Sequence, residues 1–218
     1  MARLAIYGVG SIAEQVYQYN LRYHLYDIQV FINDNASENE SFHGLPVMCF
    51  DKFKENYSFN DVSVLVTIGY TKCNTIRQRV CLKVEEAGFR LSNFISPGAN
   101  CWPASVIGHN VIVFDDVFIG TGAHVMDNVI IYEGAKIAHN VTLKENVLLS
   151  LGVVIGGNAE IGVNTFIGLN ATIKSSAVVG AYNIIASGAN VIKSSMAHSV
   201  IKGNPGVAEQ KDTLQVKI

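Results

Sequence analysis

An apolar, mostly aliphatic residue recurs at every sixth position through almost half of the chain. The series keeps one register for eighteen positions, namely Ile95, Cys101, Ile107, Val113, Ile119, Val125, Ile131, Ile137, Leu143, Leu149, Ile155, Ile161, Ile167, Ile173, Val179, Ile185, Val191 and Ala197. A helix repeats near 3.6 residues and a half-buried strand near two, so neither explains this period. A sustained period of six is typical of a parallel β-helix. Three hexads form one coil of a triangular prism, so the stretch predicts six coils.

A second series of small residues precedes each large residue by two positions. It includes Ala99, Ala123, Ala135 and Ala171. We expect the large side chains to fill the interior of the prism and the small residues to let the chain turn each corner.

The chain before the hexads has the pattern of a small α/β domain. Residues 3–7 form an apolar run typical of a buried strand, and Gly8 and Gly10 follow it directly. Ile12 and Val16 then recur at helical spacing. A strand, a glycine turn and a helix in this order open a nucleotide-binding βαβ unit.

Two further strands are predicted over residues 28–32 and 63–68, with a long helix after the second. The first ends at Asp34 and Asn35, where an acidic residue commonly binds a ribose or a base. Gly69 closes the other strand. A segment of this length supplies only half of a doubly wound sheet, which argues against a dehydrogenase with a full dinucleotide site. The pattern instead predicts a domain for one mononucleotide portion of a substrate.

These patterns divide the chain into three parts and predict an α/β domain followed by an all-β domain. Residues 1–92 should form a Rossmann-like βαβαβ domain, and residues 93–204 should form the β-helix. Residues 205–218 should form a C-terminal tail.

Composition and charge exclude several classes of protein. The formal net charge is −2, which gives no electrostatic basis for binding nucleic acid or an anionic membrane. No apolar run approaches the length needed to span a bilayer. The four cysteines have no metal-type spacing and are typical of a reduced, cytoplasmic protein.

The flat faces of the predicted prism carry few long charged side chains and suit packing against copies of the same chain. Prisms of this shape assemble by cyclic symmetry, so we expect a homotrimer. Its ligand clefts should lie between neighbouring subunits.

Histidine is the usual general base near neutral pH, and three histidines lie within the prism. His109 and His139 hold the same place in their hexads but are five hexads apart, so they should point from different faces. His124 follows a small residue and should differ again. A zinc site within one chain is therefore not expected, although a site shared between chains stays open.

Motifs along most of the chain resemble the PglD/NeuD family of bacterial sugar acyltransferases, whose fold is a left-handed parallel β-helix. They comprise the glycine turn at 8–13, FINDN at 31–35, GLPV at 44–47, TIG at 67–69, the unbroken hexads with IAHN at 137–140, and VIKGNP at 200–205. The resemblance implies transfer of an acetyl group from acetyl-CoA to the amino group of a nucleotide-linked sugar. Such sugars enter surface polysaccharides, for example lipopolysaccharide or O-antigen.

The resemblance also assigns roles to individual residues. His139 would be the general base that takes a proton from the attacking amine, with Asn140 directly after it. One coil further on, 139 + 18 = 157, the backbone N–H of Gly157 would stabilise the oxyanion. Backbone groups near Leu169 and Ser187, together with Gly157, would hold the pantetheine arm of acetyl-CoA.

Two further sets of contacts follow from the same resemblance. Lys202 would pair with a phosphate of coenzyme A. The nucleotide would lie among six residues of the first domain, namely Gly8, Gly10, Ser11, Asp34, Asn35 and Gly69.

The chain departs from the family pattern at three positions. Family members usually carry an acidic residue where Asn140 stands, many carry an asparagine in place of Tyr132, and some carry a second histidine in place of Leu148. A carboxylate would orient the imidazole. Here a backbone carbonyl, Asn140, or Glu133 or Glu145 of this chain or a neighbour could take that role.

Three functions therefore remain open from the sequence. The first is an N-acetyltransferase acting on a nucleotide-linked amino sugar. The second is an O-acetyltransferase acting on a sialic-acid-like sugar. The third is a catalytically silent trimeric binding module.

Overall fold

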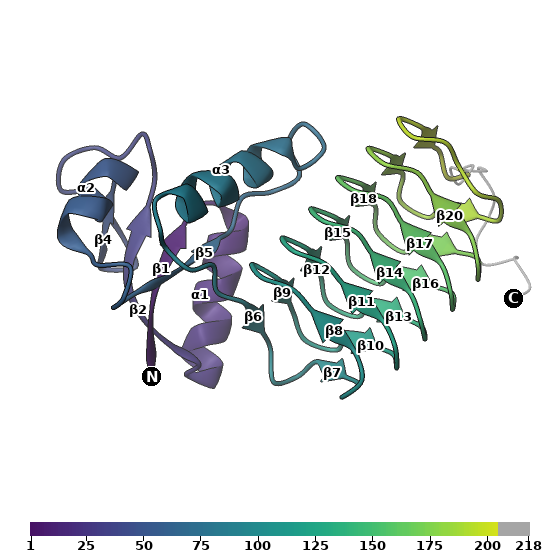
Figure 1. The fold of residues 1–218 in the computed structure, drawn as a ribbon, viewed down its shortest axis with the longest axis horizontal. Helices are drawn as coiled ribbons and strands as arrows, with labels where there is room; N and C mark the ends of the chain where they lie inside the picture. The colour runs from purple at the N-terminus through teal and green to yellow at the C-terminus, as the bar shows by residue number, and fades with distance from the viewer. Residues whose placement is uncertain (205–218) are drawn as a thin grey trace, which may run out of the picture.

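The computed structural model describes residues 1–204, and the predicted tail at 205–218 lies outside the described residues. An α/β domain stands at one end of the molecule, and a prism of stacked coils extends from it (Figure 1). The helix α1 lies between the sheet of the first domain and the first coils (Figure 1).

The first domain is a five-stranded sheet with three helices. Its elements are β1 (Ala2–Tyr7), α1 (Ser11–Tyr23), β2 (Tyr26–Ile32), β3 (Ser41–Phe42), β4 (Leu45–Met48), α2 (Phe50–Asn56), β5 (Ser63–Val66) and α3 (Thr75–Glu86). The strand order is β3-β4-β2-β1-β5, and all pairs are parallel except the β3–β4 hairpin. The predicted strands and long helices are thus present.

Both faces of this sheet are buried, as expected for parallel strands with apolar runs. Leu4 and Ile6 of β1 pack on α1 and the prism, whereas Ala5 and Tyr7 pack on α2 and α3. The prism therefore takes the place of a second helix on one side of the sheet.

The prism consists of two-residue strands that stack into three parallel sheets. The domain face, which contacts the first domain, contains β6 (Phe94–Ile95), β9 (Ile112–Val113), β12 (Ile130–Ile131), β15 (Leu148–Leu149), β18 (Phe166–Ile167), β21 (Ile184–Ile185) and β23 (Val200–Ile201). The second face contains β7 (Asn100–Cys101), β10 (Phe118–Ile119), β13 (Lys136–Ile137), β16 (Val154–Ile155), β19 (Thr172–Ile173) and β22 (Asn190–Val191). The third face contains β8 (Val106–Ile107), β11 (His124–Val125), β14 (Thr142–Leu143), β17 (Glu160–Ile161) and β20 (Val178–Val179).

Both apolar series point into the prism, which corrects the expected role of the small residues. Ile131 and Ile137 of the large series and Ala123 and Ala135 of the small series are all fully buried in one core. The corners are turned by the residue before each small one, which has a positive φ and is usually asparagine or glycine. These residues are Asn110, Asp116, Gly122, Asn128, Gly134, Asn140, Asn146, Gly152, Asn158, Asn164, Asn170, Ser176, Tyr182 and Gly188. Asparagine and glycine adopt this left-handed conformation more readily than other residues.

The predicted register is wrong at its last position. Strand β21 pairs Ile185 with Ile201, and Val179 forms a bridge with Ser195, so the last coil advances by 16 residues instead of 18. Ala197 is consequently exposed in a turn rather than buried in the interior.

The first domain is fixed to the prism by buried polar contacts as well as apolar ones. Arg77 of α3 is fully buried, and its guanidinium donates hydrogen bonds to Oδ1 and the carbonyl oxygen of Asn128 and to the carbonyl oxygen of Asn146 (3.0, 3.1 and 3.1 Å). A further bond reaches the carbonyl oxygen of Ile68 at 3.1 Å. Burial lowers the pKa of Arg77 to about 10, so the side chain is still charged at neutral pH.

A ladder of asparagines runs along the vertex next to Arg77. Its side chains hydrogen-bond in series from Asn110 to Asn128, Asn146 and Asn164 (2.8, 2.6 and 3.1 Å). Asn110 extends the ladder into the first domain, because its side chain pairs with both backbone groups of Val66. The orientation of β5 is therefore fixed relative to the coils.

Between Met1 and Asn204 no helix is both long and apolar enough to cross a membrane.

Candidate active site

A cavity opens beside the glycine turn of the first domain. Its volume is about 320 Å³, and it is lined by Gly8, Val9, Gly10, Ser11, Ile12, Thr67, Ile68, Gly69, Tyr70 and Tyr132. Four of the predicted nucleotide contacts therefore lie together, at the carboxyl ends of β1 and β5, where open parallel sheets bind ligands.

Gly8 is required by this turn. Its φ is +132°, and a Cβ at this position would lie 2.7 Å from Oγ1 of Thr67. Gly10 has no atom within 4 Å of its would-be Cβ, so its surface is open to the cavity. The turn thus exposes backbone groups without side chains at the N-terminus of α1, and backbone N–H groups at a helix N-terminus favour the binding of an anion.

The other two predicted nucleotide contacts lie outside the lining of this cavity. Asp34 accepts hydrogen bonds from the Tyr7 hydroxyl at 2.7 Å and from Lys83 Nζ at 3.0 and 2.9 Å. Asn35 is exposed, and its N–H donates to Oδ1 of Asn33 at 3.2 Å.

The paired state of Asp34 changes its pKa. Burial alone would raise the pKa of this carboxyl, but the hydrogen bonds from Lys83 and Tyr7 and the charge of Lys83 hold it below its ordinary value. The carboxylate is thus already paired with a cation.

His139 and Gly157 lie in contact on the vertex between the second and third faces. A Cβ at residue 157 would come within 2.5 Å of Cε1 and 2.6 Å of Nε2 of His139. The His139 side chain is exposed at this corner. The stacking that was predicted from the register is therefore present in the structure.

The Gly157 N–H is available to a ligand. Its neighbour Asn158 donates to the carbonyl oxygen of His139 at 3.0 Å, which holds the two coils together. Within residues 1–204 the Gly157 N–H itself donates no hydrogen bond. A free donor beside an imidazole is the arrangement needed to stabilise an oxyanion next to a general base.

Asn140 stabilises the turn at the prism corner and forms no hydrogen bond with the imidazole of His139 among the described residues. Its φ is +54°, and its side-chain amide donates to Oδ1 of Asn158 at 3.2 Å. Asparagine fits here because the corner requires a left-handed residue. The structure therefore gives no support to Asn140 as the group that orients His139.

The residues predicted for acetyl-CoA divide between two vertices. Leu169 and Ser187 follow β18 and β21 at the vertex between the domain face and the second face. Lys202 follows β23, and a Cβ on the next residue, Gly203, would lie 2.5 Å from the carbonyl oxygen of Ser187. These three residues lie together, but at a different vertex from Gly157.

The cavity and His139 lie on different sides of one prism. Tyr132 follows β12 of the domain face, whereas His139 is at the vertex opposite that face. The filled apolar core separates the two.

Two tyrosines of the cavity were not predicted as site residues. Tyr132 comes from the prism, and its ring lies 5.3 Å from that of Phe114, while burial raises its pKa. Tyr70 follows β5 and is 59% exposed. Their positions depend on how the two domains dock, which the sequence does not encode in any local pattern.

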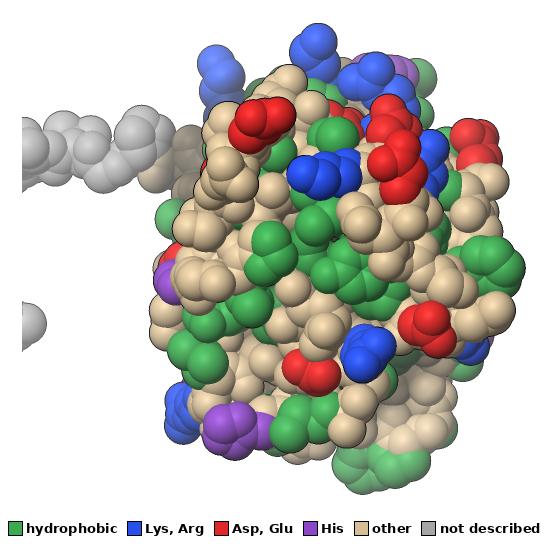
Figure 2. Space-filling view, turned by 90° about the vertical axis from the view of Figure 1, so that its left-hand side faces the viewer, with side chains coloured by type: hydrophobic (Ala, Val, Ile, Leu, Met, Phe, Trp, Pro, Cys, Tyr) green, Lys and Arg blue, Asp and Glu red, His purple; other side chains and the backbone are tan. Residues whose placement is uncertain are grey.

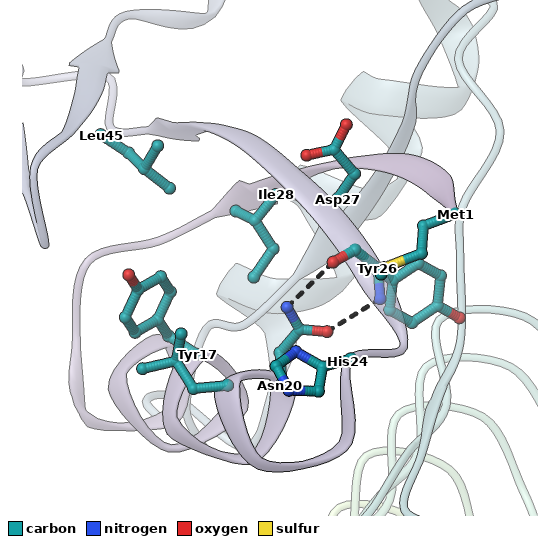
Figure 3. A pocket seen from close by; sticks show the side chains of 9 residues that line it. Met1, Tyr17, Asn20, His24, Tyr26, Asp27, Ile28 and Leu45 are labelled. Carbon is teal, nitrogen blue, oxygen red and sulfur yellow. Dashed lines mark hydrogen bonds between the residues drawn. The ribbon is translucent and has the colours of Figure 1, made fainter.

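A larger cavity, of about 500 Å³, lies elsewhere, at the start of β1 and β2. Figure 3 shows that its floor includes Asn20, whose side chain is bonded to both backbone groups of Tyr26 (2.9 and 3.0 Å). None of the predicted site residues lines this cavity.

The histidines do not converge on a metal site. His109 Nδ1 lies 3.4 Å from Asp127 Oδ1 at the vertex between the third face and the domain face, whereas His124 lies on the third face and His139 at the vertex between the second and third faces. No group of three potential metal ligands occurs within residues 1–204.

The surface of the first domain carries charges of both signs. Figure 2 shows basic and acidic side chains interspersed on the end of the molecule that this domain forms. This face therefore has no single-sign patch of the kind that binds a polyanion.

Several solved structures match this chain over nearly its whole length. The acetyltransferase domain of PglB from Neisseria gonorrhoeae, in complex with acetyl coenzyme A, is 26% identical with a TM-score of 0.84, and the match covers 93% of this chain and 97% of that one. PerB from Caulobacter crescentus, in complex with CoA and GDP-perosamine, is 24% identical with a TM-score of 0.82 and coverages of 93% and 98%. WeeI from Acinetobacter baumannii is 20% identical with a TM-score of 0.67 and coverages of 94% and 98%.

No protein-family model matches the chain, and no curated protein sequence matches it. The structural matches confirm the predicted fold, which is a small Rossmann-like domain followed by a left-handed parallel β-helix. The chain is thus similar, in both of its domains, to acetyltransferases of known structure, one of them a GDP-perosamine N-acetyltransferase, and the resemblance to PglD/NeuD-like enzymes is confirmed.

Proposed function

We propose that this protein transfers the acetyl group of acetyl-CoA to the amino group of a nucleotide-linked amino sugar. The observation that carries the proposal is the contact between His139 and Gly157 on a β-helix. It is supported by the similarity to an acetyltransferase domain that binds acetyl coenzyme A. The perosamine N-acetyltransferase of similar fold binds a nucleotide-linked amino sugar and was also solved with one histidine replaced by alanine.

His139 acts as the general base in this mechanism. The sugar amine adds to the thioester carbonyl of acetyl-CoA, and His139 takes the proton that the nitrogen loses. The carbonyl oxygen becomes negatively charged, and the free N–H of Gly157 donates to it. The tetrahedral intermediate then collapses, the C–S bond breaks, and protonated His139 gives its proton to the sulfur, so that the amide and the thiol of coenzyme A leave.

The nucleotide-linked sugar binds at the glycine turn. Gly8, Gly10 and Ser11 present backbone groups at the start of α1, which favours the diphosphate. A cavity of about 320 Å³ is at the small end of the range for ligand sites, so it holds only part of such a substrate.

A complete site needs two protomers in this proposal. The sugar held near Tyr132 faces away from His139 of the same prism. Leu169, Ser187 and Lys202 likewise lie at another vertex from His139. A cyclic homotrimer places one vertex of each prism beside a different vertex of its neighbour, which joins the two halves.

The biological setting is proposed on the same basis. N-acetylated sugars of this kind enter surface polysaccharides such as lipopolysaccharide or O-antigen. The free cysteines among the described residues suit the reducing cytoplasm. An amine acceptor is preferred over the hydroxyl of a sialic-acid-like sugar because the chain carries a nucleotide-binding domain.

The test is acetyl transfer with a panel of UDP-, dTDP- and GDP-linked amino sugars. We expect the wild type to acetylate at least one of them, and His139→Ala to lose at least ~10²-fold in kcat while its melting temperature and oligomeric state stay unchanged. His109→Ala is the matched control, because this exposed histidine lies at a different vertex, between the third face and the domain face, and should retain full activity.

Binding measurements separate this proposal from a silent module. Acetyl-CoA and a nucleotide sugar should each raise the melting temperature of the wild type, because both bind only the native state. A wild-type protein that binds neither ligand and acetylates none of the sugars would contradict the proposal.

A further inference from the structure

Three consecutive residues between β5 and α3 adopt the left-handed conformation. Lys72, Cys73 and Asn74 have φ values of 52°, 49° and 62°. Non-glycine residues disfavour this region, and three in a row are unusual. Such strain persists only where the surrounding structure holds it, and it concentrates at ligand sites.

The prism holds this turn from outside. Asn164 donates to the carbonyl oxygen of Cys73 at 2.9 Å, and the buried Asn74 donates to that of Thr165 at 3.5 Å. Oδ1 of Asn74 also accepts a hydrogen bond from Arg77 at 3.1 Å. The turn is therefore locked to the coils through the asparagine ladder and the buried arginine.

The locked turn presents Tyr70 at the mouth of the glycine-turn cavity. The N–H of Asn74 donates to the carbonyl oxygen of Tyr70 at 3.2 Å, which closes the turn. Tyr70 is 59% exposed, and the centroid of its ring lies 4.6 Å from that of Phe166 on the domain face. The turn thus holds the backbone of Tyr70, and its aromatic side chain packs against one neighbour while its remaining surface faces the cavity and solvent.

The strand order indicates which part of a substrate Tyr70 meets. The glycine turn follows β1, which lies between β2 and β5. Asp34 is at the end of β2, whereas Tyr70 is beyond the end of β5. If the diphosphate lies at the glycine turn, the nucleoside and the sugar extend to opposite sides. The prism lies on the Tyr70 side, because Tyr132 and Phe166 both belong to it.

We propose that Tyr70 and Tyr132 form the subsite for the sugar ring, with Tyr70 packing on a face of the hexopyranose. The C–H bonds on one face of a sugar ring pack well against an aromatic ring, and a residue whose backbone is already fixed loses less entropy on binding. The inference rests on the proposed function, since it assigns a subsite within the same nucleotide-sugar site. Tyr70 is accordingly a specificity-determining residue for the sugar and not for the nucleotide.

The test compares two ligands that differ only in the sugar. Isothermal titration gives Kd values for a nucleoside diphosphate and for the matching nucleotide-linked amino sugar, drawn from the UDP, dTDP and GDP series. For Tyr70→Ala we expect the Kd of the nucleotide sugar to rise about fivefold or more, a loss typical of one aromatic contact. The Kd of the nucleoside diphosphate should stay within about twofold. Tyr70→Phe should bind both ligands as the wild type does.

Phe59→Ala is the matched control, because Phe59 is also an exposed aromatic, at 52%, but lies outside the cavity. It should change neither Kd. Equal weakening of both ligands by Tyr70→Ala would place Tyr70 at the nucleotide, and no weakening would remove it from the site; either result overturns the inference.

The proposed activity can fail separately. If the wild type binds nucleotide sugars in a Tyr70-dependent way but acetylates none, the subsite stands and the acetyltransferase proposal falls. If the wild type binds no nucleotide sugar at all, both are overturned.

Discussion

The imidazole of His139 occupies the space that a side chain on residue 157 would need. A Cβ on Gly157 would lie 2.5 to 3.0 Å from three atoms of the ring. The φ of Gly157 is not positive, so the backbone conformation does not require glycine here. The contact with the His139 ring does. Val163, which holds the same place in the next hexad, shows that this position accepts a side chain.

Gly157→Ala should therefore displace the imidazole without unfolding the coil. We expect kcat to fall by roughly 10²-fold, the usual cost of misplacing a catalytic group by about 1 Å. The loss of unfolding free energy should stay under about 1 kcal/mol, because the exposed His139 ring can rotate away. Steady-state kinetics and urea unfolding measure the two effects.

A double variant shows whether Gly157→Ala lowers kcat by displacing the His139 ring. In a His139→Ala background, Gly157→Ala should change neither stability nor residual activity, so the two substitutions should be strongly non-additive. Val163→Ala is the control at another vertex and should keep the wild-type kcat. Additive losses in the double variant would show that Gly157 acts independently of His139.

The register of the hexads predicts this contact, because residues 18 apart must stack. It also predicts that the three prism histidines diverge. It fails after Val191, where the chain omits two residues from the last coil. Ala197 continues the apolar series by coincidence, since alanine is tolerated both in a core and on a surface. Counting every sixth residue does not reveal that the last coil is shorter, because an alanine still falls at the counted position.

The docking of the two domains could not be predicted in the same way. Arginine side chains are mostly exposed in folded proteins, yet Arg77 of α3 is fully buried. Its acceptors on the prism are main-chain and asparagine side-chain oxygens 51 and 69 residues away. Similarly, Asp34 meets Lys83 across 49 residues. Such pairs depend on tertiary packing, which no local spacing encodes. The asparagines at 18-residue intervals were the one available signal.

Gly8 and Gly10 should respond differently to the same substitution. Gly8→Ala forces a side chain into a φ of +132° and against Thr67, so the unfolding free energy should fall by about 1–3 kcal/mol. Gly10→Ala meets no atom within 4 Å and should cost less than about 0.5 kcal/mol.

Gly10→Ala, although it should hardly change stability, should weaken ligand binding. Gly10→Ala adds a methyl group to the cavity lining, so the Kd for a nucleoside diphosphate should rise while the fold stays intact. Urea unfolding and isothermal titration on both variants measure the contrast. A stable Gly10→Ala protein with unchanged affinity would place the diphosphate away from this turn.

The carboxylate of Asp34 should contribute to stability in a pH-dependent way. Hydrogen bonds from Lys83 and Tyr7 outweigh burial and lower its folded-state pKa. The unfolded-state value is about 3.9, so the folded state binds fewer protons between the two values. Its stabilising contribution is therefore complete above about pH 5 and is lost as the pH falls through the folded-state pKa.

Asp34→Asn isolates this contribution. Because the pair with Lys83 is about half exposed, its value at pH 7 should be about 1 kcal/mol or less. The difference in unfolding free energy between wild type and variant should shrink between pH 7 and pH 3. A difference that stays constant over this range would show that the carboxylate is not held in its charged form by these contacts.

Mixed trimers can show whether one site uses two protomers. His139→Ala removes the general base, and Gly10→Leu fills the nucleotide cavity without meeting any protein atom within 4 Å of its Cβ. Each variant alone should be inactive. Suppose that each site combines the cavity of one protomer with His139 of its neighbour. In a randomly mixed trimer the cavity is intact with a chance of one half, and the neighbouring His139 is intact with a chance of one half. One quarter of the sites then have both an intact cavity and an intact histidine. Co-expression at equal amounts should therefore restore about one quarter of wild-type kcat per site. If the cavity and the histidine of one chain formed the site, each protomer would carry one defect and the mixture would stay inactive.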